Sequence, residues 1–167
     1  MSKSIFPNAA EDIMTPDPVC AEPATTIRQL ARLFEENDIS GCPVVNQEGK
    51  VVGVVSKTDL IRRCSEGTRD IPPAYLFEIV CEQGGEDGAE DDGADPPIPE
   101  PLVCVQDFMT ESAVTVRPQT PVHEVAALMA ERHIHRVIVV DEEQFPLGVI
   151  TALDVLKVFP TPTRPGR

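Results

Sequence analysis

Apolar residues recur at helical spacing in two separate stretches of this 167-residue chain, 27–34 and 122–129. In each stretch they occupy positions i, i+3, i+4 and i+7, which is the spacing of one buried face of an α-helix. The pattern therefore predicts two amphipathic helices. Thr25 and Thr120 are predicted to cap their first turns, with Pro121 at the first position of the second helix.

Apolar and polar positions around the first helix predict short strands and turns. Residues 11–15 suggest a brief helical turn that ends before Pro16, and a short strand is expected around Val19. After the long helix, the β-rich stretch 42–55 is interrupted by Asn-Gln-Glu-Gly, which predicts a hairpin. A second, shorter helix is expected over 56–63. The unit therefore runs strand, helix, hairpin, helix.

The same order of elements returns after the second long helical pattern begins. A short strand is predicted over 114–116, a hairpin from 134–140 and 147–150, and a closing helix over 151–158. A constant offset of 95 residues aligns the two halves without gaps, and repeats of this kind indicate a duplicated folding unit. The landmarks that the offset superimposes are Met14 and Met109, Thr25 and Thr120, Gly53 and Gly148, Ser56 and Thr151, and Asp59 and Asp154.

Each unit has about 50 residues, which is marginal for independent folding, so the two copies are expected to pack against each other. The rest of the chain is predicted to form terminal arms and one connection. The resulting division is an N-terminal arm 1–9, repeat one 10–64, an acidic linker 65–104 with a short helix near 73–82 and disorder over 84–100, repeat two 105–159, and a tail 160–167.

The formal net charge of −14 argues against nucleic acid as a partner, although residues 65–104 alone account for −10 of it. The repeats themselves therefore offer little repulsion to an anionic ligand. Five cysteines without a C-x-x-C pair favour reduced thiols over disulfides or a zinc site. No apolar run is long enough for a membrane span and no signal peptide is recognisable, so a cytoplasmic protein is expected.

The spacing S/T-x-x-D occurs at both predicted strand-to-helix junctions, as Ser56 to Asp59 and Thr151 to Asp154. A helix-capping box explains this spacing structurally. A ligand site is the alternative, because a carboxylate at a helix N-terminus can accept from a sugar diol while the amides favour an anion. A glycine three residues upstream in both copies supports close approach of backbone or ligand.

Basic residues break the symmetry of the repeat. His133, His135 and Arg136 stand where the first copy has Asp38, Ser40 and Gly41. A solvated basic corner is one interpretation, and a phosphate site with Arg136 as a fork donor is the other. Two histidines without a third ligand nearby do not indicate a metal.

These paired motifs together resemble a tandem pair of cystathionine beta-synthase (CBS) domains, also known as a Bateman module. The resemblance covers most of the chain except the linker and the termini. It implies an α/β (α+β) fold with two β-α-β-β-α repeats packed about a pseudo-two-fold axis. It also implies two clefts for adenine nucleotides or adenosyl compounds, so AMP, ADP, ATP and S-adenosylmethionine are the expected ligands, and it implies a homodimer.

Carried onto this sequence, the resemblance assigns two sets of ligand-binding residues. Site A comprises Val19, Ile39, Ser40, His135, Arg136, Val149, Thr151 and Asp154. Site B comprises Val54, Ser56, Asp59, Val114 and Ile134. Site B has Gly41 at the position equivalent to Arg136, so site A is expected to bind phosphate more tightly.

No P-loop, nucleophile elbow or other catalytic constellation is present, so the expected role is regulation of an unknown partner protein and not catalysis. The alternative is an interaction scaffold whose clefts are empty. Such a scaffold would act through dimerisation and through the apolar side of the predicted linker helix, Leu76, Phe77 and Val80.

Overall fold

The structure is a computed structural model that describes residues 9–66 and 103–159. Most of the predicted N-terminal arm, the linker helix near 73–82, the predicted disorder over 84–100 and the tail lie outside the described residues. The elements of the first copy are α1 (Ala10–Ile13), β1 (Thr15–Pro16), α2 (Ile27–Glu36), β2 (Gly41–Val45), β3 (Val51–Ser56) and α3 (Lys57–Glu66). Those of the second copy are η1 (Val105–Asp107), β4 (Thr110–Glu111), β5 (Thr115–Val116), α5 (Val122–Arg132), β6 (Arg136–Val140), β7 (Pro146–Thr151) and α6 (Ala152–Lys157).

The two long helices form where the apolar spacing predicts them, but both predicted caps are one residue early. The hydroxyl of Thr26 accepts from the backbone N–H of Gln29, whose side chain accepts in return from the N–H of Thr26. Thr25 and Thr120 instead accept from the amide three residues before them and close the preceding turn. In the second copy Pro121 is therefore the N-cap, and not the first helical residue.

Both hairpins form as antiparallel pairs, β2 with β3 and β6 with β7, with a register shift at the same point of each. In the second copy β5 adds a short parallel pair with β6 that includes Val116 and Val139. The strand predicted around Val19 is wrong, because pairing in the first copy is limited to a single parallel bridge between Ala21 and Val44. This bridge stands 95 residues before the pair in β5 and β6, so the symmetry holds although the strand is shorter.

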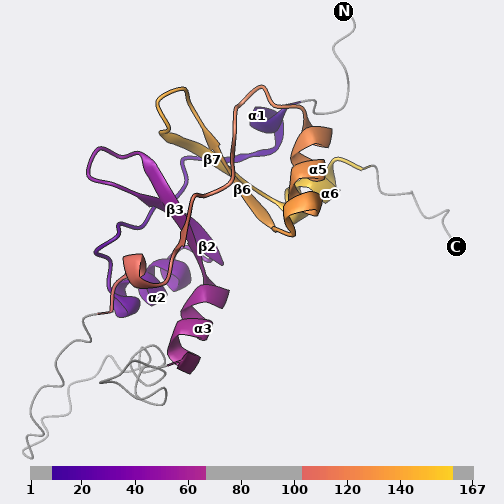
Figure 1. Ribbon diagram of the computed structural model, residues 1–167. Helices are drawn as coiled ribbons and strands as arrows, with labels where there is room; N and C mark the ends of the chain where they lie inside the picture. The colour runs from indigo at the N-terminus through magenta and orange to yellow at the C-terminus, as the bar shows by residue number, and fades with distance from the viewer. Residues whose placement is uncertain (1–8, 67–102, 160–167) are drawn as a thin grey trace, which may run out of the picture.

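The first strand of each copy pairs with the sheet of the other copy. Thr15 of β1 lies opposite Val149 of β7, and Thr110 of β4 lies opposite Val54 of β3. The two contacts are equivalent in the repeat, because Thr110 follows Thr15 by 95 residues and Val149 follows Val54 by 95 residues. Such reciprocal contacts define a two-fold relation, so the structure contains two repeats related by a pseudo-two-fold axis. Figure 1 shows the strands of the two copies meeting at the centre of the molecule.

The leading helices are exchanged in the same way. The amide of Ala10 donates to the carbonyl of Thr120, and the equivalent amide of Val105 donates to Thr25. Ala10 is thus buried in the core of the second copy, and Val105 in the core of the first. Because each core contains a segment from the other repeat, neither repeat can complete its core alone.

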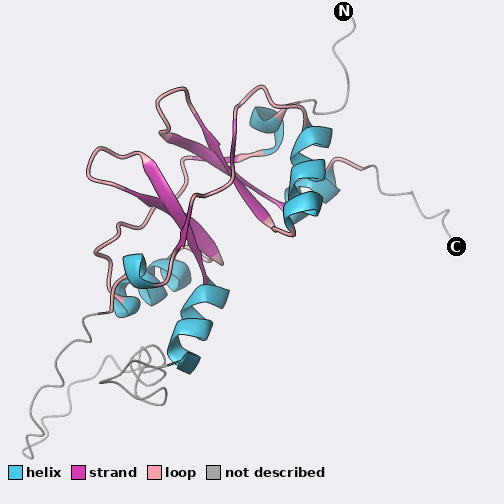
Figure 2. Cartoon of the chain, viewed as in Figure 1, coloured by secondary structure: helices cyan, strands magenta, loops and turns pink. Residues whose placement is uncertain are grey.

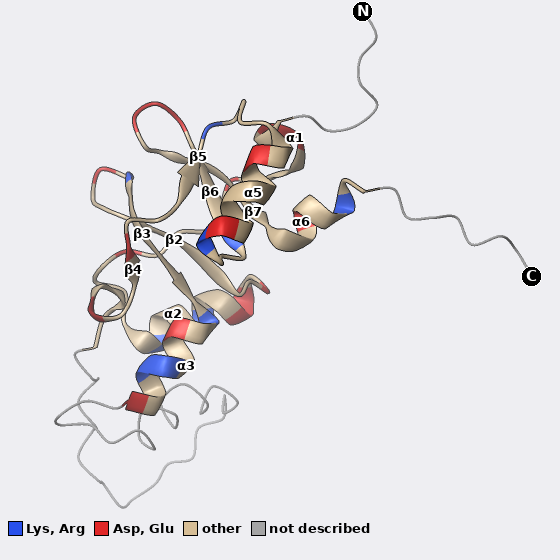
Figure 3. Ribbon diagram, turned by 45° about the vertical axis from the view of Figure 1, so that its right-hand side comes forward, with Lys and Arg blue, Asp and Glu red and all other residues tan. Residues whose placement is uncertain are grey.

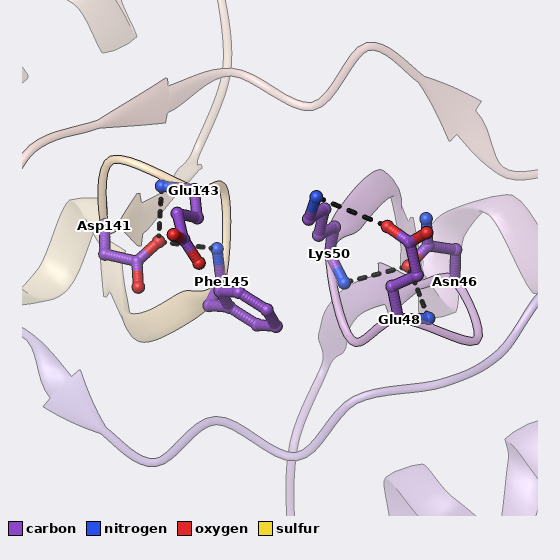
Figure 4. Close-up of polar contacts among 6 residues, drawn as sticks. All are labelled: Asn46, Glu48, Lys50, Asp141, Glu143 and Phe145. Atoms are coloured by element: carbon purple, nitrogen blue, oxygen red, sulfur yellow. Dashed lines mark hydrogen bonds and ion pairs between the residues drawn. The ribbon is translucent and has the colours of Figure 1, made fainter.

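Helices cover the outer sides of the pair of sheets, with α2 and α3 at one end and α5 and α6 at the other (Figure 2). The two hairpin loops lie side by side (Figure 4). The side chain of Asn46 accepts from the amides two and four residues further on, and Asp141 does the same in the second loop. The amide of Val51 donates to the carbonyl of Gln144, which joins the two hairpins. These contacts confirm the predicted first turn.

Candidate functional site

Each strand-to-helix junction contains the hydroxyl and carboxylate predicted from the repeated motif. The hydroxyl of Ser56 donates to Oδ2 of Asp59 over 2.6 Å, and that of Thr151 donates to Oδ2 of Asp154 over 2.7 Å. The same carboxylate oxygen accepts from the backbone N–H of the hydroxyl residue in both copies, over 2.9 Å. Both motifs are therefore capping boxes, as one of the two sequence interpretations states.

Within the part of the chain that the structure describes, the second oxygen of each carboxylate has only a cationic partner at the surface. Nζ of Lys157 lies 2.9 Å from Oδ1 of Asp154, and the Lys157 side chain is 75% exposed. The corresponding distance from Arg62 to Asp59 is 3.9 Å. Surface ion pairs of this kind contribute little to stability, about 0–1 kcal/mol. A ligand hydroxyl can therefore displace Lys157 from Oδ1 without breaking the capping box.

Asp154 is held in its ionised form by these contacts. Burial by itself would raise the pKa of its carboxyl group. Hydrogen bonds from the hydroxyl and the backbone N–H of Thr151, together with Lys157, outweigh burial and lower the pKa below its ordinary value. A carboxylate at this position is an acceptor for hydroxyl groups at neutral pH.

The glycines upstream of the two motifs make room for protein and not for a ligand. A Cβ on Gly148 would lie 2.5 Å from Sδ of Met14 and 2.9 Å from the carbonyl oxygen of Thr15. A Cβ on Gly53 would meet Met109 and the carbonyl of Thr110 in the same way. Of the two readings of these glycines, close approach of backbone is the one that applies. They accommodate the exchanged first strands.

A cavity of about 370 Å³ lies between the repeats, and we name it cavity A. Six of the eight residues predicted for site A line it: Val19, Ile39, Ser40, Arg136, Val149 and Thr151. Asp154 is not among the lining residues, but Oδ2 of its carboxylate accepts from the hydroxyl of Thr151, which is. The structure adds lining residues that the sequence reasoning did not assign to site A: Thr15, Asp17, Pro18, Asn37, Asp38 and Gly41.

Arg136 reaches across from the second repeat to the first. Its Nη2 donates to Oγ of Ser40 over 2.7 Å. Burial lowers the pKa of the guanidinium, and the nearby Cys42 and Asp59 act in the opposite direction. The guanidinium nevertheless stays charged at neutral pH, since arginine does not deprotonate in proteins. Only one of its five N–H groups is needed for Ser40, so the others can serve an anion in cavity A.

Gly41 is what allows this placement. It is equivalent to Arg136 in the repeat, and the two residues face each other between the copies. A Cβ on Gly41 would overlap Nη1 of Arg136 and would lie 2.8 Å from its Cζ and 2.7 Å from the carbonyl oxygen of Val55. The site therefore accommodates one arginine, and the residue opposite it has to be small. The loss of symmetry noted in the sequence has a steric cause.

The predicted basic corner is divided between two cavities. His135 does not line cavity A. It lines a second cavity of about 340 Å³ together with His133 and with apolar side chains of α5 and α6. Neighbouring residues at the start of a strand point to opposite sides, so His135 and Arg136 separate. The role of His135 in site A stays a prediction.

The residues predicted for site B are placed less favourably. Ile134 lines the second cavity, whereas Val54, Ser56, Asp59 and Val114 line neither of these two cavities. Val54 pairs with β4, and the carbonyl of Val114 accepts from the amide of Ile138. Their role in binding stays a prediction.

Two residues that the sequence reasoning missed carry charge at cavity A. Asp17 and Asp38 both have positive φ, of 50°, a conformation that Asp tolerates better than most residues. A signal for them exists in the sequence, because each is an acidic turn residue one or two positions before a predicted site residue, Val19 or Ile39. Figure 3 shows that acidic and basic residues occur on the helices and loops of both repeats.

Neither a membrane span nor a metal site is found among residues 9–66 and 103–159. None of the helices there combines the length and hydropathy needed to cross a bilayer. In the same residues no group of three His, Cys, Asp or Glu side chains gathers in a way that could hold a metal ion.

Comparison with protein families matches the CBS domain model twice, over residues 10–66 and 105–161. Among curated proteins, MJ1426 of Methanocaldococcus jannaschii is 29% identical over 157 residues, which cover 89% of both chains. Longer relatives are matched over a small part of their length, for example 23% of inosine-5'-monophosphate dehydrogenase from the same organism.

Solved structures of similar fold contain adenosyl ligands or AMP. The CBS domain pair of protein MJ0100 in complex with 5'-methylthioadenosine and S-adenosyl-L-methionine has a TM-score of 0.64 at 20% identity, covering 90% of this chain and 94% of that one. CBSX2, a CBS-pair protein from Arabidopsis thaliana, in complex with AMP has a TM-score of 0.64 at 25% identity, covering 90% and 95%.

Proposed function

The chain belongs to the CBS domain family, and from this premise we propose that it is a regulatory module that binds an adenine nucleotide or an adenosyl compound in cavity A. Ligand binding changes how the module associates with a partner protein that it regulates. The longer enzymes among its relatives are matched over less than a quarter of their length, so their activities are not carried over to it.

One observation carries the proposal: apolar side chains of both repeats meet a guanidinium and a capped carboxylate motif around a single cavity. Val19, Ile39 and Val149 offer an apolar surface for the adenine ring. Thr151, with Asp154 behind it, suits the ribose hydroxyls, and Arg136 suits a phosphate or a carboxylate. A volume of about 370 Å³ is within the usual range for a ligand pocket, roughly 300–1,000 Å³.

Ligands bound by similar proteins support the same class. The CBS pair of MJ0100 is known with 5'-methylthioadenosine and S-adenosyl-L-methionine, and CBSX2 is known with AMP. All three ligands share an adenosine unit. The same unit is what the three apolar side chains and the Thr151 motif of cavity A would recognise.

A thermal-shift titration with adenosine, AMP, ADP, ATP and S-adenosylmethionine tests the proposal. A ligand at 100 times its Kd stabilises the folded state by about 2.7 kcal/mol. For a chain of this size that corresponds to a rise in Tm of roughly 5–11 °C. If none of the five ligands raises Tm at millimolar concentration, the regulatory proposal fails and the alternative, an interaction scaffold with empty clefts, is favoured.

Two variants separate the roles of the site residues. Asp154→Ala is expected to abolish the ligand-induced shift in Tm. The shift is measured against the Tm of the unliganded variant, because the substitution also removes the capping contacts and so changes the Tm without ligand. Asp107→Ala removes a capping contact of the same kind, from the backbone N–H of Cys104 to the carboxylate, at a residue that lines neither cavity, and is the matched control, expected to retain the shift. Arg136→Ala is expected to weaken AMP about ten-fold more than adenosine, since hydrogen bonds to a charged group contribute roughly 1.5–3 kcal/mol. Equal losses would remove the phosphate role.

A second copy of the chain is the proposed partner of the exposed apolar helix faces. Ile61 of α3 and Leu156 of α6 are 58% and 61% exposed and are equivalent in the repeat, and Leu153 and Phe159 add to the second face. Large apolar residues grouped on one face are typical of interaction surfaces. Leu156→Lys is expected to convert a dimer into a monomer in sedimentation equilibrium, whereas Glu142→Lys on the β6–β7 loop is expected to leave the dimer intact. A wild-type monomer would refute the dimer.

A further inference from the structure

We infer that Asp17 and Asp38 make cavity A selective for an adenosyl compound with a cationic group in its tail, and that they discriminate against nucleoside triphosphates. The inference rests on the proposed function and narrows its ligand class. It derives from charges that the sequence reasoning did not assign to the site. Arg136 remains the partner of a single anionic group, such as a carboxylate or one phosphate.

The charged residues that line cavity A are two acids and one base. Asp17 and Asp38 contribute two negative charges and Arg136 contributes one positive charge, so the lining carries a net charge of −1. The two carboxylates are exposed, and within the described residues neither has a hydrogen-bonding or ionic partner. They are therefore available to a ligand.

The backbone does not require acids at these positions. Ser112 and His133 occupy the equivalent positions of the second copy and also have positive φ, of 59° and 53°. A hydroxyl or an imidazole therefore suits the same conformation, so the shared turn geometry does not account for two carboxylates beside cavity A. Their negative charge is a property that only the first copy has.

Charge at this range is enough to rank ligands. Two unit charges about 8 Å apart in water interact by an amount that changes affinity about two-fold, so two carboxylates change it about five-fold for each unit of ligand charge. S-adenosylmethionine carries a sulfonium, an ammonium and a carboxylate, and the three suit Asp17, Asp38 and Arg136 together. AMP places two negative charges in the same space, and ATP places about four.

The experiment is a calorimetric titration with S-adenosylmethionine, adenosine, AMP and ATP, without divalent cations and at about 0.15 M salt. Wild type is expected to bind S-adenosylmethionine more tightly than AMP. It is expected to bind ATP about five-fold more weakly than AMP, because the two additional negative charges of ATP meet a lining with a net charge of −1. The double variant Asp17→Asn with Asp38→Asn keeps side-chain size and tolerates positive φ. In this double variant, the affinity for S-adenosylmethionine divided by the affinity for ATP is expected to fall at least ten-fold. The affinity for adenosine is expected to change less than two-fold.

Glu142→Gln removes one negative charge from the β6–β7 loop, outside the lining of cavity A, and is the matched control. It is expected to leave all affinity ratios unchanged. A double variant with an unchanged ratio, or a wild type that prefers ATP, overturns the selectivity while the proposed function stands. If none of the four probes binds, the proposed function fails and the selectivity fails with it.

Discussion

Replacing Gly41 with alanine tests whether steric exclusion between the repeats makes the two copies different. The new Cβ would overlap the guanidinium of Arg136 and approach the carbonyl oxygen of Val55 to 2.7 Å. The guanidinium is a flexible group and can move, but it then loses its hydrogen bond to Ser40, worth about 1 kcal/mol at this half-exposed position. The backbone carbonyl cannot move as easily, and overpacking of this kind costs about 1–3 kcal/mol.

We therefore expect Gly41→Ala to destabilise the protein by about 2–4 kcal/mol. In Tm this is a loss on the order of 4–16 °C for a chain of this length. The assay is urea unfolding of Gly41→Ala, Arg136→Ala and the double variant. In the Arg136→Ala background the contact with the guanidinium is absent, so Gly41→Ala should cost about 1 kcal/mol less, because only Val55 still opposes it.

Gly53→Ala provides the matched control. Its Cβ would meet Met109 and Thr110, and not Arg136, so its effect should be the same in both backgrounds. If Gly41→Ala costs equally much with and without Arg136, within about 0.3–0.5 kcal/mol, the guanidinium does not lie over Gly41 and the steric reasoning is refuted.

Three further outcomes are expected. Gly148→Ala should destabilise the fold by about 1–3 kcal/mol in urea unfolding, because its Cβ would lie 2.5 Å from Sδ of Met14; a change under about 0.5 kcal/mol would contradict the exchange of first strands. Ionised Asp154 stabilises the folded state above the ordinary carboxyl pKa of about 3.9, and this contribution is lost as pH falls through the lowered pKa of the folded state. The difference in unfolding free energy between wild type and Asp154→Asn should therefore shrink below about pH 4. A difference that grows there would disagree with the capping contacts. Burial, with Cys20 nearby, raises the pKa of Cys42 to about 12, so its thiol should react with iodoacetamide at pH 8 about a thousand-fold more slowly in the folded than in the unfolded chain, and equal rates would contradict its burial.

Periodicity and the constant offset predicted most of the fold. The two long helices, the two hairpins and the closing helices follow from local spacing, and local spacing depends on neighbours within a few residues. The errors lie where partners are distant. The strand predicted around Val19 is reduced to a single bridge between Ala21 and Val44, whereas the equivalent residues of the second copy pair at two positions in β5 and β6.

Comparison of the two copies also singled out part of the candidate site. Thr151 and Arg136 were recognised because the repeat made them comparable with Ser56 and Gly41. His135 lines the second cavity and not cavity A, because neighbouring residues in a strand point to opposite sides, and this alternation was not used in the sequence reasoning. Asp17 and Asp38 have no counterpart in the motif.

The sequence by itself determined that this chain is a duplicated unit with an S/T-x-x-D motif at the start of each closing helix, because duplication and motif spacing are visible along the chain. Only the tertiary structure decided that the first strands are exchanged and that Gly53 and Gly148 accommodate them. It also decided that Arg136 lies over Gly41 and lines the same cavity as Asp17 and Asp38. These contacts join residues that are far apart in the sequence, such as Gly148 and Met14, and their geometry depends on how two copies pack, which no local pattern encodes.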